Sequence, residues 1–415
     1  MPAAVSPLFR LLFPIFVAGS FGFLWANSPI DPSAFELPPL EPLPDDARLQ
    51  DAERLFKGLV KGPEDMVFSC EGADCFGYAS LADGQLLRWT VDGGSETLVF
   101  LNRTACVAAC PSDEIIPRCG ELAFEDVCGR PLGLEMSPDG TSILIADAYF
   151  GLLSLQLSDN TLRQVAGEYR DLDGRLTKLN FPNAVVFGKS GKLYVDETTS
   201  RFQRRTVPYE TLEGGNTGGL LVLDDWRDAE AVPRKVLAGL HFANGMLLDK
   251  DERFILVLET TRARLTRVDL SDASKVTATV AYEGLPCTPD NMAWAGEGQR
   301  YIWIGCAVRR TKPFSLLQAT APYPGVRRFL AAIAYFTGGM QLLYKLLPKT
   351  GMLLLMDLGE AGTGESPKIV DTLLDKTGGV MFVAGGYPFG DKVYIGSHKP
   401  EFDFIARIHY PAPKE

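Results

Sequence analysis

Residues that hold soft metals or nucleic acids are scarce in this sequence. Only three histidines occur among 415 residues, and none of the eight cysteines forms a Cys-x-x-Cys pair, so a zinc site is not expected. The formal net charge is −11, and no block of lysines or arginines interrupts the chain. A nucleic-acid partner is therefore not expected either, because it requires a basic surface.

The cysteines then favour disulfides over metal binding. Cys110, Cys119 and Cys128 share one polar loop, and Cys70 lies close to Cys75. Disulfides imply an oxidising compartment. The one N-glycosylation sequon begins at Asn102 and lies in the same region. Asn102 is thus a candidate glycosylation site, although so short a sequon also arises by chance.

The N-terminal region predicts export. Residues 11–26 are uncharged and apolar, Arg10 precedes them, and acidic residues follow. The stretch is at the lower limit for a bilayer span and long for the core of a cleaved signal, so residues 1–27 are a signal anchor or a signal peptide. The preceding positive charge places the N-terminus in the cytosol. We expect a single-pass type II membrane protein or a secreted one, with its body lumenal or extracellular, in the endoplasmic reticulum or at the cell surface.

The rest of the chain divides into a short linker and one large domain. Residues 28–49 are proline-rich and acidic, which predicts an extended stalk. Residues 50–415 contain short apolar runs of strand length, each closed by a turn signal. These runs form an internal repeat, with clear units that begin near residues 130, 181, 242 and 288 and degenerate ones at both ends. The pattern predicts an all-β, six-bladed β-propeller.

One segment, residues 326–349, departs from this pattern. Its composition is helical and amphipathic, and it is inserted within the fifth unit. A helix that caps one face of the propeller is one interpretation. A lid or a membrane-surface helix is the other, because the segment contains Arg, Lys and aromatic residues.

Alignment of the units reveals a polar column where most positions should be apolar or small. The first strand of each blade lines the central channel, so equivalent positions form a ring around the axis. Clustered oxygens are costly to bury without a cation, and oxygen ligands without Cys or His select Ca²⁺, or else Mg²⁺ or Mn²⁺. The alternative is that Asn and Asp at strand starts only form turns. The column consists of Glu64, Leu132, Asn183, Asn244 and Asp290, with Asn291 next to it.

Several stretches resemble the strictosidine-synthase-like family, and within it the adipocyte plasma membrane-associated protein branch. They include GPED at 62–65, CGRPLGLEMSPDG at 128–140, LPCTPDNMAW at 285–294 and KVYIGSHKP at 392–400, and the resemblance covers residues 50–410 in order. It implies a six-bladed propeller, often tethered by an N-terminal membrane helix. The family is similar to paraoxonases and gluconolactonases, which are metal-dependent lactonases and arylesterases. By that similarity the metal ligands fall on Glu64, Asn183, Asn244, Asp290 and Asn291, and a loop disulfide falls on Cys119 and Cys128.

Two departures from these relatives limit the chemistry that is expected. Strictosidine synthase uses a glutamate shortly before its YIG motif, whereas this chain has Met381 there, between Val380 and Phe382. The strictosidine reaction is therefore not expected. Paraoxonases carry a histidine in a Pro-His-Gly turn, and this chain has Leu132 in its place. None of the three histidines falls in the column, and His241 is only adjacent to it.

The sequence thus predicts a metal-dependent hydrolase of small esters or lactones. In this prediction Asp290 is both a ligand and the proton acceptor, and Glu64 is the alternative acceptor. The competing hypothesis is a membrane-tethered binding or adhesion propeller in which the ion is structural. A scaffold whose pocket is blocked by the insertion is a third. An apolar mouth is expected from some of Phe181, Phe242, Met246, Met292 and Trp294.

Overall fold

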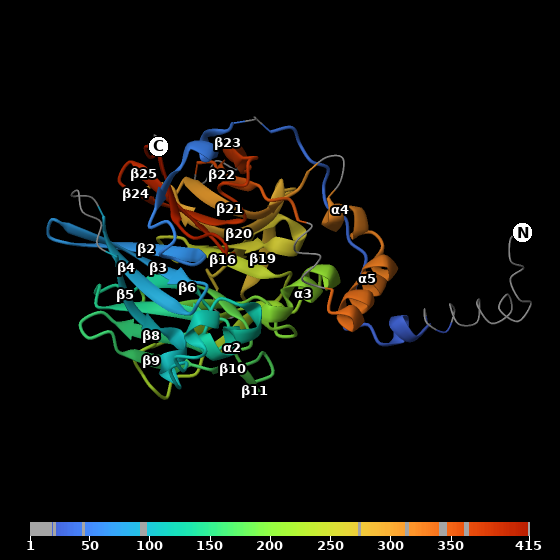
Figure 1. Ribbon diagram of the computed structural model, residues 1–415, viewed down its shortest axis with the longest axis horizontal. Coiled ribbons are helices and arrows are strands. Elements are labelled where there is room, and N and C mark those ends of the chain that lie inside the picture. The colour runs from blue at the N-terminus through green and yellow to red at the C-terminus, as the bar shows by residue number, and fades with distance from the viewer. Residues whose placement is uncertain are drawn as a thin grey trace, which may run out of the picture.

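The chain folds as a six-bladed β-propeller, as the repeats predicted (Figure 1). The computed structural model describes residues 19, 22–43, 46–91, 98–272, 275–311, 315–339, 347–360 and 365–413. The four main strands of each blade form an antiparallel sheet, and outside the sixth blade they follow each other in the sequence. Five of the six sheets have four strands, and the third has six because β10 pairs parallel with β15.

The strands run outward from the axis in each blade. The first blade contains β2 (Pro63–Glu71), β3 (Asp74–Leu81), β4 (Gln85–Val91) and β5 (Leu98–Arg103), and the second contains β6 (Pro131–Met136), β7 (Ser142–Asp147), β8 (Gly151–Gln156) and β9 (Leu162–Ala166). The third contains β12 (Pro182–Phe187), β13 (Leu193–Glu197), β14 (Gly218–Leu223) and β15 (Arg234–Leu240), extended by β10 (Glu168–Arg170) and β11 (Leu176–Lys178), and the fourth contains β16 (Ala243–Leu248), β17 (Phe254–Glu259), β18 (Arg264–Asp269) and β19 (Thr277–Glu283). The fifth contains β20 (Cys287–Trp294), β21 (Tyr301–Arg309), β22 (Gly351–Asp357) and β23 (Lys368–Asp375), and the sixth contains β24 (Val383–Phe389), β25 (Lys392–Ser397), β26 (Ile405–His409) and β1 (Glu53–Leu55).

The two ends of the domain close the ring. The short strand β1 pairs antiparallel with β26, so the outermost strand of the sixth blade comes from the start of the domain. The second and third strands of a blade lie between its two neighbouring blades and are largely buried on both faces. In β7, for example, every residue is buried. Apolar side chains from neighbouring blades pack together there, for example Tyr78 of the first blade with Leu134 and Ile145 of the second.

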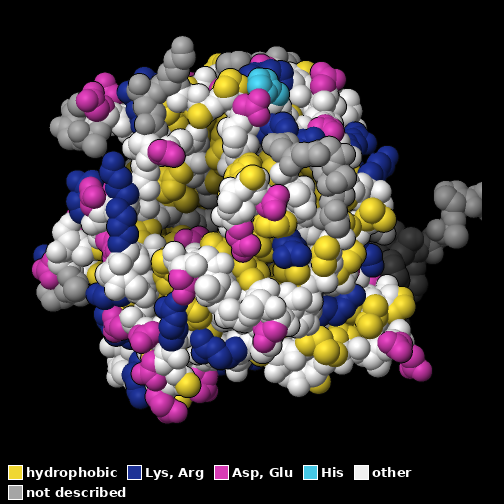
Figure 2. Space-filling model, turned by 90° about the vertical axis from the view of Figure 1, so that its left-hand side faces the viewer, with side chains coloured by type: hydrophobic (Ala, Val, Ile, Leu, Met, Phe, Trp, Pro, Cys, Tyr) yellow, Lys and Arg dark blue, Asp and Glu magenta, His cyan; other side chains and the backbone are white. Residues whose placement is uncertain are grey.

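Helices gather at one end of the propeller, on the right of Figure 1. Most of them lie in the loops that connect the strands, and the two longest of these loops follow β21 and β5. Figure 2 shows the opposite face, which is hollowed near its middle with hydrophobic side chains around the hollow. The α-helices are α2 (Glu125–Cys128), α3 (Val207–Glu213), α4 (Leu316–Thr320) and α5 (Pro324–Thr337), and the 3-10 turns are η1 (Arg48–Asp51), η2 (Thr104–Val107), η3 (Ile116–Arg118), η4 (Leu122–Phe124), η5 (Arg204–Thr206) and η6 (Thr260–Arg262).

The helical insertion lies within the fifth blade, between β21 and β22, and helix α5 forms its described part. Helix α5 begins at Pro324, where the missing N–H of proline costs no hydrogen bond. It ends before Gly338, which adopts a left-handed conformation with φ +65°. The predicted helical segment continued to residue 349, and its residues 340–346 lie outside the described part of the chain.

The segment predicted to be a stalk is extended but does not stand away from the propeller. Residues 28–43 have no helix or strand. Ile30 is buried with Leu212 of α3 and Ala331 of α5, and Phe35 donates its backbone N–H to the carbonyl of Ala321 at 3.1 Å. Ile30 thus packs between helices, whereas Leu37 belongs to a hydrophobic cluster of the fourth and fifth blades. We find no helix among the described residues that is long and apolar enough to cross a membrane, and residues 1–18, which hold much of the predicted anchor, are not among them.

Candidate functional site

The inner strands of all six blades share one irregularity near their starts. A residue pair with the second strand is followed by a register shift, and pairing resumes three residues later. In the fifth blade two further pairs precede this one. The first residue within each shift therefore occupies an equivalent position around the axis, as the sequence alignment assumed. The shifts lie between Pro63 and Met66, Pro131 and Leu134, Pro182 and Val185, Ala243 and Met246, Pro289 and Met292, and Val383 and Gly386. The equivalent residues are Glu64, Leu132, Asn183, Asn244, Asp290 and Ala384.

The amides and carboxylates of this ring contact one another across blades. Asn244 donates an Nδ2 hydrogen to Oδ1 of Asp290 at 2.8 Å and another to the hydroxyl of Thr260 at 3.1 Å. Its own carbonyl oxygen accepts from the backbone N–H of Gly245 at 3.0 Å. Asn291 donates to the hydroxyl of Tyr387 at 3.3 Å. The Oδ1 atom of Asn183 is buried and has no partner among the described residues.

Glu64 forms a buried ion pair with a residue outside the column. Its carboxylate contacts the guanidinium of Arg130, which directly precedes β6 in the next blade, and both side chains are almost fully buried. Burial raises the pKa of Glu64, whereas the positive charge of Arg130 opposes this effect. Arg130 also donates to the backbone carbonyl of His398 at 3.0 Å. Its Nε and Nη1 atoms are buried and contact no acceptor in the described part of the chain.

A histidine lies beside Asp290. The Nδ1 atom of His398 is 3.3 Å from Oδ2 of Asp290, although the two groups are not aligned as a hydrogen bond. Burial raises the pKa of Asp290 to about 7, and the hydrogen bond from Asn244 partly offsets the rise. Burial and the nearby charge of Lys399 lower the pKa of His398 well below its usual value. We infer that His398 is neutral at neutral pH, when Asp290 is present in both protonation states.

Further cations surround the ring at the end that carries the helices. Arg204 of η5 forms an ion pair with Glu125 at 2.7 Å, and Glu125 also accepts from the hydroxyl of Tyr149 at 2.8 Å. Burial lowers the pKa of Lys399 to about 8, and the charge of Arg204 adds to that effect. The site therefore combines two buried carboxylates with several positive charges.

The ring is almost closed to solvent. Only 5% of Asp290 and 3% of Glu64 are exposed. Among the residues predicted to form an apolar mouth, Phe181 and Phe242 pack against each other with ring centroids 6.4 Å apart. Met246 and Met292 belong to the hydrophobic clusters of the core, and Trp294 packs against one of those clusters.

These residues do not fit the predicted calcium site as the structure arranges them. Calcium requires six to eight oxygen ligands. Glu64 already faces a guanidinium, and the side-chain oxygen of Asn244 accepts from Gly245. Oδ1 of Asn183 is a buried oxygen without a partner among the described residues. Within the described residues no group of three or more His, Cys, Asp or Glu side chains is placed to hold a metal. Calcium, magnesium or manganese binding stays a prediction.

The sequence of the chain is similar to those of several known proteins. The sequence model of the Strictosidine synthase family matches residues 183–272. The adipocyte plasma membrane-associated protein of Gallus gallus is 30% identical over 390 residues, which cover 92% of this chain and 85% of that protein. The chain belongs to the adipocyte plasma membrane-associated protein family. Together with the disulfides, this membership indicates a membrane or extracellular protein.

One plant relative and two solved structures are also similar to this chain. The STRICTOSIDINE SYNTHASE-LIKE 13 protein of Arabidopsis thaliana is 30% identical over 358 residues, which cover 86% of this chain and 80% of that protein. A luciferin-regenerating enzyme is 10% identical with a TM-score of 0.49, and the aligned regions cover 88% and 99% of the two chains. A periplasmic gluconolactonase of Pseudomonas aeruginosa is 13% identical with a TM-score of 0.41 and coverage of 76% and 71%. These last two likenesses are too loose to carry a functional argument.

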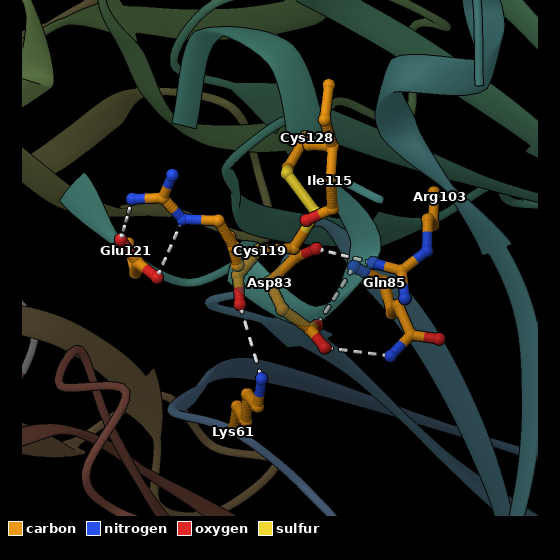
Figure 3. Close-up of a disulfide and its surroundings, with 9 residues drawn as sticks. Lys61, Asp83, Gln85, Arg103, Ile115, Cys119, Glu121 and Cys128 are labelled. Carbon is orange, nitrogen blue, oxygen red and sulfur yellow. Dashed lines mark hydrogen bonds and ion pairs between the residues drawn. A yellow bond between two sulfur atoms is a disulfide. The ribbon is translucent and has the colours of Figure 1, made fainter. Parts of the chain in front are cut away.

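All eight cysteines of the chain form disulfides, and the predicted Cys119–Cys128 bond is confirmed. It lies beside a polar turn of the first blade, where Lys61 donates to the carbonyl oxygen of Cys119 at 3.3 Å (Figure 3). Cys287 is bonded to Cys306. The remaining bonds join Cys70 to Cys75 and Cys106 to Cys110. Glycosylation of Asn102 stays a prediction.

Two residues of the site in this family member were missed by the sequence reasoning. Arg130 stands one residue before the start of an inner strand, outside the column that was compared. His398 follows β25, a second strand, which runs antiparallel to β24 and therefore ends beside the start of that inner strand. A second alignment of the residues that follow each second strand would have brought His398 into consideration. His241 lies in a loop, where its Nδ1 atom is 2.8 Å from the carbonyl oxygen of Gly215.

Proposed function

We propose that the protein hydrolyses small esters or lactones at the polar ring, with Asp290 as the proton acceptor. The observation that supports this most directly is the position of Asp290 between the amide of Asn244 and the ring of His398. A buried carboxyl group whose pKa is raised to about 7 can take up and return a proton near neutral pH. Perturbed carboxyl groups of this kind are frequent at catalytic sites.

In the proposed reaction a water molecule attacks the carbonyl carbon of the substrate. Asp290 accepts one proton of that water as the new carbon–oxygen bond forms and the carbonyl oxygen becomes an oxyanion. When the oxyanion collapses, the bond to the leaving alcohol oxygen breaks, and Asp290 returns the proton to that oxygen. His398 is a positioning residue in this scheme, because it lies against the carboxyl group from the neighbouring blade.

The test is the substitution Asp290→Asn, which keeps the oxygen that accepts from Asn244 but removes the proton acceptor. Hydrolysis of phenyl acetate and of a simple lactone by the purified protein is expected to fall about 100-fold in kcat/KM. Glu135→Gln, which alters another acid on an inner strand away from this pair, is the matched control and should retain turnover. Unchanged turnover in Asp290→Asn would contradict the proposal. The same assay with EDTA tests the predicted dependence on calcium.

A second candidate function is a binding or adhesion propeller without turnover. The near-complete burial of Glu64 and Asp290 favours it, because a substrate must reach these groups. Equilibrium binding without hydrolysis of any ester or lactone would distinguish this function from the first.

We further propose that the N-terminal region anchors the protein in a membrane, with the propeller lumenal or extracellular. The apolar residues 11–26 lead directly into a surface with four exposed aromatic side chains, here called the aromatic surface. Phe23 contacts Phe336 of α5 with ring centroids 5.2 Å apart, and Arg328 lies over the ring of Trp25. Aromatic side chains of this kind are common at membrane interfaces. The relatives are named for association with the plasma membrane, which agrees with this proposal. The aromatic surface consists of Phe23, Trp25, Tyr335 and Phe336.

A further inference from the structure

The polar ring already contains a cation that belongs to the chain. The guanidinium of Arg130 is fully buried and contacts the carboxylate of Glu64 from the next blade. A buried carboxylate is costly unless a positive charge neutralises it, and this contact supplies one. Burial lowers the pKa of Arg130 and the charge of Glu64 opposes this effect, but the delocalised guanidinium of arginine stays protonated in proteins.

The position of this guanidinium is fixed by the backbone on both sides of Arg130. The disulfide between Cys119 and Cys128 ends two residues before it (Figure 3). The backbone N–H of Arg130 donates to Oδ2 of Asp147 at 2.8 Å, and its carbonyl accepts from the N–H of Ala148 at 3.0 Å. The intervening Gly129 has φ +84° and lies against Thr104, so a side chain would not fit there. These contacts fix the backbone of Arg130, and the carboxylate of Glu64 and the backbone carbonyl of His398 hold its guanidinium.

A metal ion and this guanidinium would compete for the same carboxylate. A divalent cation bound to Glu64 would lie close to a positive charge that cannot leave without breaking a buried ion pair. We propose that Arg130 takes the place of a metal in this ring and that the site operates without one. The N–H groups on Nε and Nη1 of Arg130, which lack an acceptor among the described residues, then face the carbonyl or oxyanion oxygen of a bound substrate. This last clause rests on the proposed hydrolase function.

The first part of the experiment measures metal binding and folding without reference to activity. The purified full-length protein is treated with EDTA and dialysed, and Ca²⁺ is then added during thermal unfolding and isothermal titration calorimetry. We expect no shift in Tm and no binding. Stoichiometric Ca²⁺ with a dissociation constant below about 1 mM would overturn the proposal.

The second part tests the ion pair with a double-mutant cycle. Arg130→Met leaves Glu64 buried without a partner, so its Tm should fall well below that of the wild type. Glu64→Gln combined with Arg130→Met removes both charges and should recover most of that loss. Equal Tm losses from Arg130→Met in the presence and absence of Glu64 would overturn the role of Arg130 as the ring cation.

The third part uses the folded double variant and Arg130→Lys to test whether Arg130 stabilises the oxyanion. If the wild type hydrolyses phenyl acetate, turnover should survive EDTA and fall about 100-fold in kcat in the double variant. Arg130→Lys keeps the charge but loses the paired donors, and it should retain only part of the activity. Turnover that disappears with EDTA would overturn the proposal. Absence of turnover in the wild type would refute the proposed function, and the metal and folding measurements would still decide the role of Arg130.

Discussion

The side chain of Glu135 shows what burial does to a single carboxyl group in this propeller. It lies three residues beyond Leu132 on β6, half-buried, and accepts from the backbone N–H of Phe187 at 3.3 Å. Burial raises its pKa to about 8, the hydrogen bond opposes this rise, and the nearby Asp65 adds to it. The folded protein therefore binds more protons than the unfolded chain between about pH 4.5 and 8, and this group lowers the free energy of unfolding as the pH rises through that range.

Glu135→Gln should remove this dependence. We expect the variant to match the wild type near pH 4.5 and to exceed its free energy of unfolding by about 1–2 kcal/mol at pH 8, a value reduced for partial solvation. Urea unfolding at several pH values measures the difference. The same change at the exposed Glu168 is the control and should leave the pH profile unchanged. A constant difference at all pH values would mean that packing, not ionisation, is responsible.

Individual site residues differ in how far the sequence could predict them. Asn183, Asn244 and Asp290 were found because each repeats at the same position of its unit, and the structure places them at equivalent points of the ring. Arg130 and His398 approach the same ring from outside the repeated column. Their contacts depend on how neighbouring blades are oriented, and no spacing within one unit carries that information.

At the scale of elements, α5 and the helical residues 22–26 make the aromatic surface. Tyr335 and Phe23 are each 57% exposed, whereas the opposite side of α5 packs on the propeller through Ala331 and Arg327. A helix with aromatic residues outward and an apolar sequence leading into it is suited to lie at a membrane surface. We therefore expect this part of α5 to touch lipid when the protein is anchored.

Since all native cysteines are paired, one introduced cysteine can be labelled selectively. The introduced cysteine of the Phe336→Cys variant is labelled with an environment-sensitive fluorophore, and the full-length protein is reconstituted into phosphatidylcholine vesicles. We expect a blue-shifted emission and quenching by brominated lipids. The same label at Leu172→Cys, an exposed apolar position of the third blade, should report water. Identical spectra at the two positions would show that α5 does not contact the bilayer.

The strands of the repeats were easier to predict than α5. A strand of the propeller is signalled by alternating apolar residues between turns, and this signal recurs in each unit. The end of α5 is determined by the left-handed glycine at position 338, which the composition of residues 326–349 concealed. Similarly, the proline-rich composition of residues 28–43 predicted extension correctly but gave no sign of the crevice that Ile30 fills.

The whole molecule depends on closure of the sixth blade by β1. Leu55 pairs with Ile405 of β26 and is buried in the cluster between the sixth and first blades. Because each blade packs only on its two neighbours, an open ring would expose two blade faces and release the inner strands that carry the polar ring.

Leu55→Ala should therefore lower the free energy of unfolding by about 2–4 kcal/mol. Glu53→Ala, which removes a pair with Arg407 on an exposed side of the same strand, should cost less than about 1 kcal/mol. Urea unfolding followed by both tryptophan fluorescence and far-ultraviolet circular dichroism measures both variants. Coincident transitions in Leu55→Ala would show that the six blades still unfold as one unit. A fluorescence change that precedes the loss of circular dichroism would show that the ring opens before the strands unfold, which would also disrupt the arrangement of Glu64, Arg130 and Asp290.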